Sequence, residues 1–301
     1  MKTRSLLLTV LLCFVSTFHV ISQSRTMESE NLRILSWNIY MLPYLSWFNG
    51  NGHRAKIIGE QLVHSDYQII VFQEAFSVKC RRILKKILQE QYPYQYGPSN
   101  DSSWSLRSNS GLWVLSKLPL NQLKCIKFKE SSGYDMIAQK GAALFEGEFN
   151  GKRFQLMATH LQSSHSQDIR EKQYQEISAL LEEFRSVDVP QILCGDFNTE
   201  MSNKPRYETM LKTLNAENGT LSGNIQSTYD EINNTLAKQK DGKEEVIDYI
   251  LARNTSRIAS IQRQVLEFYH SEANFESHLS DHYALEATVR FAPSTTLVAG
   301  K

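Results

Sequence analysis

The chain of 301 residues has little cysteine, glycine or proline, with four Cys, 14 Gly and 7 Pro. So few cysteines exclude a fold held by a disulfide framework, and so little glycine and proline excludes collagen-like and low-complexity chains. The chain also lacks an excess of one charge, because 33 Lys and Arg face 32 Asp and Glu. No global positive field therefore holds the protein on nucleic acid or on an anionic membrane. With 41% hydrophobic residues, the chain is expected to form a globular fold with a large core.

No uninterrupted apolar run reaches the roughly 20 residues that span a bilayer. The N-terminus instead has the layout of a secretory signal peptide, because Lys2 and Arg4 precede the apolar run 6–15 and small residues follow up to Ser24. We therefore predict that residues 1–24 are a cleaved signal peptide. The mature protein is expected to be secreted or periplasmic and to have no transmembrane anchor.

After this leader, short β-type runs alternate with amphipathic helical patterns, and no repeat or linker interrupts them. The expected helices are 53–63, 78–91, 169–184 and 207–214, and the expected strands are 32–37, 67–72, 111–116, 123–128, 141–149, 153–159, 189–194, 246–251, 264–268 and 283–290. Asn150-Gly151 predicts an antiparallel hairpin between two of these strands. We predict an α/β fold, a four-layer sandwich of two mixed β-sheets flanked by helices. One domain is expected over residues 25–292, followed by a frayed tail, 293–301.

Polar residues recur where the predicted strands end. They are Asn38, Glu74, His160, Asp196 with Asn198, and the pair Asp281-His282 before the last strand. One such residue is usually a turn former or a cap. Carboxylates, amides and histidines repeated at strand ends favour a site at a common edge of the sheets. Clustered carboxylates repel one another unless a cation joins them, and hard oxygen ligands select Mg²⁺ or a similar ion.

Three short stretches carry most of this signal. In Gly195–Asn198, an acceptor-only carboxylate and an amide stand two residues apart, so one can orient water while the other holds a phosphate oxygen or a metal. An Asx turn is the plainer interpretation of the same stretch. The pair Asp281-His282 offers a metal ligand and an imidazole suited to proton transfer. Asp248 lies in an apolar run, so it needs a buried partner, for which a histidine is a candidate.

The order of these motifs resembles the endonuclease/exonuclease/phosphatase superfamily over residues 32–291. The motifs are Trp37-Asn38, Gln73-Glu74, Thr159 to Gln162, Gly195 to Asn198, Asp248-Tyr249 and Ser280 to His282. Within the superfamily the chain is most similar to the secreted bacterial-type neutral sphingomyelinases, also called sphingomyelinase C. That similarity rests on Met41 to Pro43 with Gly52 to Ala55, Lys140-Gly141, His160 to Gln162, Ser227 to Asp230, and Asp281 to Tyr283 leading to Glu286 to Thr288.

The resemblance implies a divalent-metal cleft at one end of the sandwich, holding Mg²⁺ with Mn²⁺ or Co²⁺ as substitutes. It implies hydrolysis of sphingomyelin or a related phosphosphingolipid at a membrane surface, by water attack at phosphorus, to ceramide and phosphocholine. By the same analogy the metal ligands are Glu74, Asn38 and Asp281, with Glu74 the principal one. A metal with Lys and His donors would stabilise the negative charge of the transition state.

The resemblance also implies a role for each remaining polar residue. His282, aligned by Asp248, would be the general base. Asp196 and Asn198 would act on the attacking water and the phosphate, or hold a second ion. His160 would hydrogen-bond a phosphoryl oxygen. Lys140, with Asp135 five residues before it, would bind the phosphate.

Two features of the sequence bear on lipid recognition. The stretch 266–280 is shorter than the aromatic hairpin of many such enzymes, and its Phe268, Tyr269 and Phe275 are interpreted either as lipid contacts or as core residues. A choline headgroup requires an aromatic cage. The candidates for that cage are Tyr40, Trp47, Phe48, Trp104 and Tyr229.

Three other functions compete with this one. A secreted metal-dependent nuclease shares the chemistry, and its phosphate-binding patch would be Lys79, Arg81, Arg82, Lys85 and Lys86, a run that we interpret as the solvated face of a helix. Thr199-Glu200 argues against an inositol polyphosphate phosphatase, which tends to have an arginine there. A binding protein without catalysis would usually have lost an acid or a histidine, and none is missing. We expect a monomer without a nucleic-acid partner.

Other histidines and cysteines have no expected role in the site. His53, His64, His165, His270 and His278 match no catalytic position, and we predict surface or capping roles for them. Cys194 is expected to be a core residue. Whether Cys80 and Cys125 pair cannot be read from the sequence.

Overall fold

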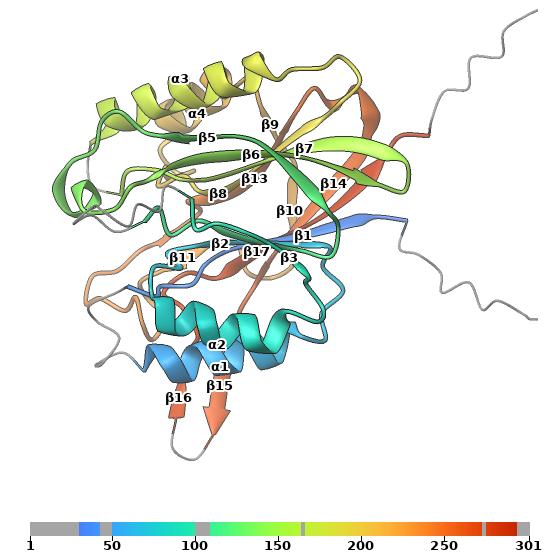
Figure 1. Cartoon of the computed structure of the whole chain (residues 1–301). Helices are drawn as coiled ribbons and strands as arrows, with labels where there is room; N and C mark the ends of the chain where they lie inside the picture. The colour runs from blue at the N-terminus through green and yellow to red at the C-terminus, as the bar shows by residue number, and fades with distance from the viewer. Residues whose placement is uncertain (1–29, 43–49, 100–108, 164–165, 273–274, 294–301) are drawn as a thin grey trace, which may run out of the picture.

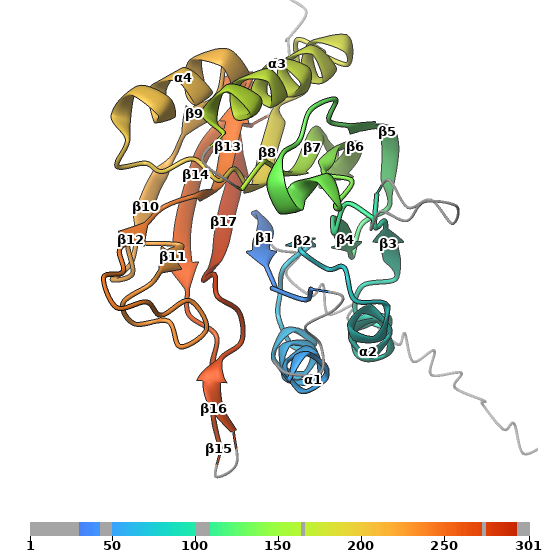
Figure 2. The same cartoon turned by 90° about the vertical axis from the view of Figure 1, so that its left-hand side faces the viewer.

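A computed structural model of the chain describes residues 30–42, 50–99, 109–163, 166–272 and 275–293. In these ranges two mixed β-sheets pack face to face and two helices cover the outer face of each sheet (Figures 1 and 2). This arrangement confirms the predicted four-layer α/β sandwich. The predicted signal peptide and residues 294–301 of the predicted tail lie outside the described residues.

The first sheet has seven strands in the order β10-β14-β17-β1-β2-β4-β3. Their bounds are β1 Leu32–Asn38, β2 Ile69–Gln73, β3 Tyr94–Tyr96, β4 Trp113–Ser116, β10 Thr220–Ser222, β14 Ile258–Leu266 and β17 Ala284–Phe291. Strands β1 and β2 run parallel, whereas β17 is antiparallel to β1. Helices α1 (Asn51–Leu62) and α2 (Val78–Leu88) cover the outer face.

The second sheet has six strands in the order β5-β6-β7-β8-β13-β9. Their bounds are β5 Leu120–Lys127, β6 Gly141–Phe149, β7 Lys152–His160, β8 Gln191–Asp196, β9 Glu217–Asn218 and β13 Asp248–Arg253. Strands β6 and β7 form the antiparallel hairpin that Asn150-Gly151 predicts, and β7 runs parallel to β8. Helices α3 (Gln167–Glu183) and α4 (Lys204–Leu214) cover this sheet.

Strand β1 shows how the layers are held together. Its residues Leu32 and Ile34 pack into the core between the two sheets, and Leu35 and Trp37 pack against the layer of α1 and α2. Because successive side chains of a strand point to opposite faces, a strand in the middle of the sandwich is hydrophobic on both faces. The stretch 32–37, which was expected to be a buried strand, therefore has apolar side chains on both faces.

The parallel pairs bring the polar strand ends together. In the first sheet Asn38, the last residue of β1, is in register with Gln73, the last residue of β2, and Glu74 follows. In the second sheet His160 at the end of β7 is in register with Asp196 at the end of β8. Parallel strands place their carboxyl ends at one edge of a sheet. The packing of the sheets then places both edges at the same end of the sandwich.

Several short strands were not predicted, because two to four residues show no period that a sequence can reveal. Besides β3, β9 and β10, they are β11 (Tyr229–Asp230) with β12 (Glu244–Glu245), and β15 (Tyr269–Glu272) with β16 (Phe275–His278). Strands β15 and β16 form a small hairpin that projects from the body of the molecule (Figure 2). The helix η1 (Gly133–Met136) is a single turn of 3-10 helix.

The predicted surface role is wrong for His278, which is buried. Its Nε2 lies 2.8 Å from Glu267, and its Nδ1 accepts a hydrogen bond of 3.0 Å from the backbone N–H of Thr235. His53 and His64 are exposed and His270 is half-buried. The partners of His278, which are Glu267 and Thr235, lie 11 and 43 residues away in the sequence, so no local pattern signals the burial of this histidine. His165 lies outside the described residues.

The described residues include three cysteines and Phe268, for which the sequence left alternatives. Cys80 and Cys125 are free thiols, and Cys194 lies in the core, as predicted. Phe268 stacks on Trp37 with 4.5 Å between ring centroids and packs against the core, so it is a core residue rather than a lipid contact.

Candidate active site

The site begins with a glycine that lets two strands meet. Gly195 has a φ of 150°, and a Cβ at this position would overlap the carbonyl oxygen of Thr159 on the neighbouring strand. Because only glycine tolerates this approach, β7 and β8 bring His160 and Asp196 side by side at their ends.

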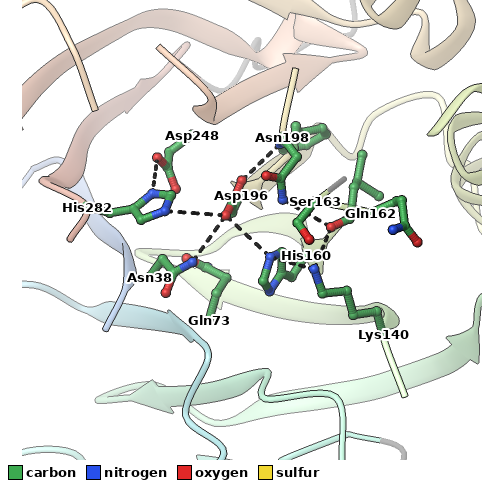
Figure 3. A network of polar contacts seen from close by, with 12 residues as sticks. Asn38, Gln73, Lys140, His160, Gln162, Ser163, Asp196, Asn198, Asp248 and His282 are labelled. Carbon is green, nitrogen blue, oxygen red and sulfur yellow. Dashed lines mark hydrogen bonds and ion pairs between the residues drawn. The ribbon is translucent and has the colours of Figure 1, made fainter. Parts of the chain in front are cut away.

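Asp196 lies at the centre of a polar network that joins the two sheets (Figure 3). Its Oδ2 accepts a hydrogen bond of 3.1 Å from Nδ2 of Asn38, on the other sheet. The same oxygen lies 3.4 Å from Nε2 of His160 and 3.9 Å from Nε2 of His282. Its Oδ1 accepts a hydrogen bond of 2.9 Å from the backbone N–H of Asn198. The Asx turn that the sequence left as an alternative is thus present, and it lies inside the site.

His282 is oriented from the opposite side of its ring. Its Nδ1 lies 2.9 Å from Oδ2 of Asp248, which places the required partner beside this buried carboxylate. The indole of Trp37 donates a hydrogen bond of 3.0 Å to the carbonyl of His282, and the ring of Tyr229 lies 5.0 Å from the imidazole. These contacts leave Nε2 of His282 as the ring nitrogen that faces Asp196.

Lys140 forms the other side of the site. Its buried Nζ lies 2.8 Å from Oδ1 of Asp135 and 2.9 Å from Nε2 of His160, and it donates a hydrogen bond of 2.9 Å to the carbonyl of Leu161. A lysine ammonium only donates, so Nε2 of His160 accepts and the proton of the neutral ring is on Nδ1. Within the described part of the chain, that Nδ1 is buried without a hydrogen-bond partner.

Glu74 and Asp281 complete the set of carboxylates. Glu74 has a positive φ of 54°, which is uncommon for a residue with a Cβ. Among the described residues, its buried Oε2 has no hydrogen-bond partner. Asp281 follows Ser280, whose hydroxyl donates to the carbonyl of Asn38 at 2.5 Å. This bond ties the segment before the last strand to the end of β1.

Burial dominates the electrostatics of the carboxylates. Burial and the nearby charge of Asp281 raise the pKa of Glu74 to about 7. Burial and Asp248 raise the pKa of Asp196 to about 6, and burial raises the pKa of Asp281. Ionisation of three buried acids in one cleft is unfavourable, and a bound cation would stabilise their ionised forms.

The two histidines shift in opposite directions. Burial lowers the pKa of His282, but the charges of Asp248 and Asp196 outweigh it and hold that pKa well above its usual value. Burial and the charge of Lys140 lower the pKa of His160 well below its usual value. His160 is therefore the neutral imidazole of the site.

These side chains line one cavity of about 310 Å³. Its walls include Glu74, His160, Asp196, Asn198, Asp281 and His282. A larger cavity of about 790 Å³ is lined by Asp230 and Tyr283 and contains none of the predicted site residues. We assign the chemistry to the smaller cavity because the strained Glu74 and the buried histidines converge there.

The donor set of the cleft fits a hard divalent cation. Carboxylate and amide oxygens are the ligands that Mg²⁺ prefers, and Oε2 of Glu74 is a buried oxygen in need of a partner. In the described part of the chain, ligand atoms of Asp196, Asp248 and His282 lie within 4.8 Å of one another. That triplet is already accounted for by the hydrogen bond between Asp248 and His282.

The comparisons with known proteins agree with this geometry. Residues 35–282 match the endonuclease/exonuclease/phosphatase family. The chain belongs to this family. It is 30% identical over 251 residues to a phospholipase C of Staphylococcus aureus, which covers 74% of each chain. It is 25% identical over 307 residues to a sphingomyelinase C of Bacillus cereus, covering 89% of this chain and 91% of the relative.

Solved structures give the same result at the level of the fold. Two crystal structures of beta toxin from Staphylococcus aureus superpose with TM-scores of 0.76 and 0.75 at 27% identity, covering 85% of this chain and 99% of theirs. The second, a double mutant, contains bound magnesium ions. The family membership and the two-sheet fold that the motifs predicted are thus confirmed.

Sequence reasoning missed one residue that holds the site together. Arg54 is fully buried and donates to the carbonyls of Ile39, Tyr40 and Leu279 at 2.6 to 3.1 Å, and to Oδ1 of Asn51 at 2.7 Å. It therefore fixes both the segment after Asn38 and the segment before Asp281. Arg54 belonged to a family motif, but an arginine on an expected helix gives no sign that it is buried.

The aromatic-cage candidates are only partly placed. Tyr229 lines the cleft. Tyr40 lies two residues after Asn38, with its ring 5.7 Å from the guanidinium of Arg54. Trp47, Phe48 and Trp104 lie outside the described residues, and nothing is described of the side chain of Phe275.

Proposed function

We propose that this protein is a secreted, Mg²⁺-dependent phosphodiesterase that hydrolyses sphingomyelin or a related phosphosphingolipid to ceramide and phosphocholine. The observation that carries the proposal is the convergence of Glu74, Asp196 and the pair Asp248-His282 in one buried cleft. The similarity to sphingomyelinase C and phospholipase C supports the choice of substrate.

Glu74, Asn38 and Asp281 would hold the cation, with Mn²⁺ or Co²⁺ as substitutes for Mg²⁺. Glu74 supplies the unpartnered Oε2, and the amide oxygen of Asn38 keeps a lone pair beside the bond that it accepts from the backbone N–H of Tyr40. A bound divalent ion polarises phosphoryl oxygens and lowers the pKa of a water ligand.

His282 would act as the general base. With Nδ1 held by Asp248, the lone pair of Nε2 is available to take the proton of the attacking water, and Asp248 stabilises the imidazolium that forms. Asp281 contributes to the raised pKa of His282. Compensation of that charge by a cation favours the neutral ring that a base requires.

Lys140, His160, Asp196 and Asn198 would act on the phosphate and the water. The N–H groups of His160 and Asn198 are donors for phosphoryl oxygens, whose negative charge increases in the transition state. The three N–H donors of Lys140 are directed to Asp135, His160 and the carbonyl of Leu161, so Lys140 would contribute its positive charge rather than a direct hydrogen bond. Asp196 accepts hydrogen bonds from Asn38 and Asn198, so its free lone pairs can orient the water or hold a second ion.

The basic run on α2 gives no support to the nuclease alternative. Lys79, Arg82, Lys85 and Lys86 are exposed on a helix of the outer layer. Arg81 is half-buried and donates to the backbone carbonyls of Ala75 and Phe76. The run is therefore the solvated face of a helix.

Export of the protein would bring it to the membrane that contains its substrate. Residues 1–24 would direct export and be removed, and the mature chain would act as a monomer at the lipid surface. In the described part of the chain, no helix has the length and apolar character needed to cross a bilayer.

The experiment that tests the function is phosphocholine release from sphingomyelin vesicles by the chain from residue 25 onward, with Mg²⁺ and with EDTA. A plasmid-nicking assay runs beside it. We expect release that depends on Mg²⁺ and no nicking. Nicking without phosphocholine release would move the substrate to nucleic acid, and release in EDTA would contradict the role of the metal.

A further inference from the structure

The turn η1 and the residue after it expose three large hydrophobic side chains. Tyr134 is 93% exposed, and Met136 and Ile137 are each 51% exposed. Tyr134 is the most exposed large hydrophobic side chain among the described residues. Single exposed hydrophobic residues are ordinary on a protein surface, whereas a cluster of them marks an interaction site. We call Tyr134, Met136 and Ile137 the apolar turn.

The exposure of the apolar turn does not come from a loosely held loop. Between Tyr134 and Met136, the buried carboxylate of Asp135 points inward. Its Oδ1 lies 2.8 Å from Lys140, and its Oδ2 accepts hydrogen bonds of 2.6 and 2.8 Å from the backbone N–H and hydroxyl of Ser163. The tight attachment of Asp135 fixes the backbone and directs the neighbouring side chains outward.

The same contacts place the apolar turn at the rim of the active-site cleft. Ser163, which holds Asp135, lines the cleft together with His160. Lys140, the other partner of Asp135, is bonded to His160. In Figure 1 the green turn at residues 133–136 lies at the same end of the molecule as β11, and in Figure 2 this end faces the viewer.

We propose that the apolar turn docks on the lipid surface that contains the substrate, an inference that rests on the proposed phosphosphingolipid hydrolysis. A phosphosphingolipid keeps its chains in the bilayer while its phosphodiester enters the cleft, so the rim of the cleft must touch the membrane. Tyrosine suits the interface between water and lipid, and methionine adapts to an irregular apolar surface. Because the protein has almost no net charge, hydrophobic contact rather than global attraction must hold it there.

The test replaces two members of the apolar turn, in the double variant Tyr134→Ser with Met136→Ser. Its matched control is Tyr94→Ser with Val187→Ser, which removes an aromatic and an aliphatic side chain that are 40% and 78% exposed. Tyr94 is in register with Ser116, which pairs with the first residue of β2, and Val187 precedes β8. Both control positions therefore lie at the opposite end of the sheets from the cleft.

Two substrates separate docking from chemistry. One is sphingomyelin in phosphatidylcholine vesicles, and the other is a short-chain sphingomyelin dissolved as monomers. We expect the double variant to lose about tenfold or more in turnover on vesicles, equivalent to about 1.4 kcal/mol, and to stay within about twofold of the wild type on monomers. The control should stay within about twofold on both, and thermal unfolding should show that every variant is folded.

Three results would overturn the inference. Wild-type turnover of vesicles by the double variant would show that the turn does not dock. An equal loss on vesicles and monomers would assign the turn to the catalytic site. A wild-type dimer that the double variant converts to a monomer would assign it to a second copy of the chain. A wild type that cleaves neither substrate would instead refute the proposed function, and this inference with it.

Discussion

Nδ1 of His282 lies 2.9 Å from Oδ2 of Asp248, and the two residues come from different sheets. Asp248 opens β13 in the second sheet, and His282 lies just before β17 in the first. The contact closes the active-site end of the sandwich and also sets the direction of Nε2. A single pair thus links the packing of the two sheets to the proposed chemistry.

The first prediction concerns this pair. His282→Ala should lower kcat for sphingomyelin by about 10³-fold, in the range expected for the loss of a general base. Asp248→Asn should lower it by at least about 10²-fold, because the ring loses the acceptor that holds its tautomer. The measurement is kcat on vesicles, with circular dichroism to verify folding. His64→Ala, at an exposed position, is the control and should retain full activity. Normal turnover by His282→Ala would remove this residue from the mechanism.

The second prediction concerns Glu74 and pH. The pKa of Glu74 is raised from 4.5 to about 7, so its ionised form is unfavourable in the metal-free fold. A carboxyl group whose pKa is higher in the folded than in the unfolded protein contributes to stability at low pH. This contribution is lost as the pH rises through the pKa of the folded protein. In EDTA, Glu74→Gln should therefore increase the free energy of unfolding by about 2 kcal/mol at pH 8 and change it little at pH 4. Denaturant unfolding at both pH values measures this.

The same residue should make cation binding depend on pH. Because the metal binds the carboxylate and protons compete for it, Mg²⁺ should raise the melting temperature more at pH 8 than at pH 6. Glu74→Gln should abolish most of that effect. Glu60→Gln, an exposed position on α1, is the matched control and should respond to Mg²⁺ as the wild type does. An undiminished Mg²⁺ response in Glu74→Gln would place the ion elsewhere.

The third prediction concerns Arg54 as a positioning residue. Its guanidinium donates to the carbonyls of Ile39, Tyr40 and Leu279, and a lysine cannot reproduce this fork of donors. Arg54→Lys should cost about 3 kcal/mol of stability. It should also raise the Mg²⁺ concentration needed for half-maximal activity by about tenfold, because the segments of Asn38 and Asp281 lose their common anchor.

A purely structural role would change stability without changing the Mg²⁺ requirement, so the metal titration decides between the two. Arg82→Lys, on the exposed face of α2, should change neither quantity.

The fourth prediction concerns Asp230, which joins the loop after β11 to β17. Its carboxylate accepts bonds from the backbone N–H groups of Ile232 and Asn233 and from the hydroxyl of Tyr283. Burial opposes its ionisation, but these bonds prevail and lower the pKa of Asp230 below 3.8. A carboxyl group whose pKa is lower in the folded protein stabilises the fold at pH values above its pKa in the unfolded chain. This contribution is lost as the pH falls through its pKa in the folded protein.

Asp230→Asn should thus lower the free energy of unfolding by about 2 kcal/mol at pH 7, with the deficit shrinking below about pH 3.5. Denaturant titrations at pH 7 and pH 3 would show the difference. A deficit of equal size at both pH values would mean that the charge of Asp230 contributes nothing.

Much of the fold could be predicted from local pattern. The apolar residues Leu32, Ile34, Leu35 and Trp37 predict a buried strand because they fall on both faces of β1. Asn150-Gly151 predicts its hairpin because few residue pairs tolerate that turn. The polar residues at the ends of β1, β2, β7 and β8 could be recognised because strand ends are local features. Seven short strands gave no signal, since two to four residues are too few to show a period.

The candidate site divides in the same way. The residue types at the strand ends could be recognised without a structure, and so could the need of Asp248, an acid in an apolar run, for a partner. The packed fold was needed to identify His282 as this partner, to show that Arg54 and His278 are buried and that Phe268 stacks on Trp37, and to place the exposed Tyr134 beside the cleft. The physical reason is that period and turn chemistry act over a few residues. Burial and pairing arise when distant segments pack against each other, as in the bond between Arg33 and Glu286, which are 253 residues apart.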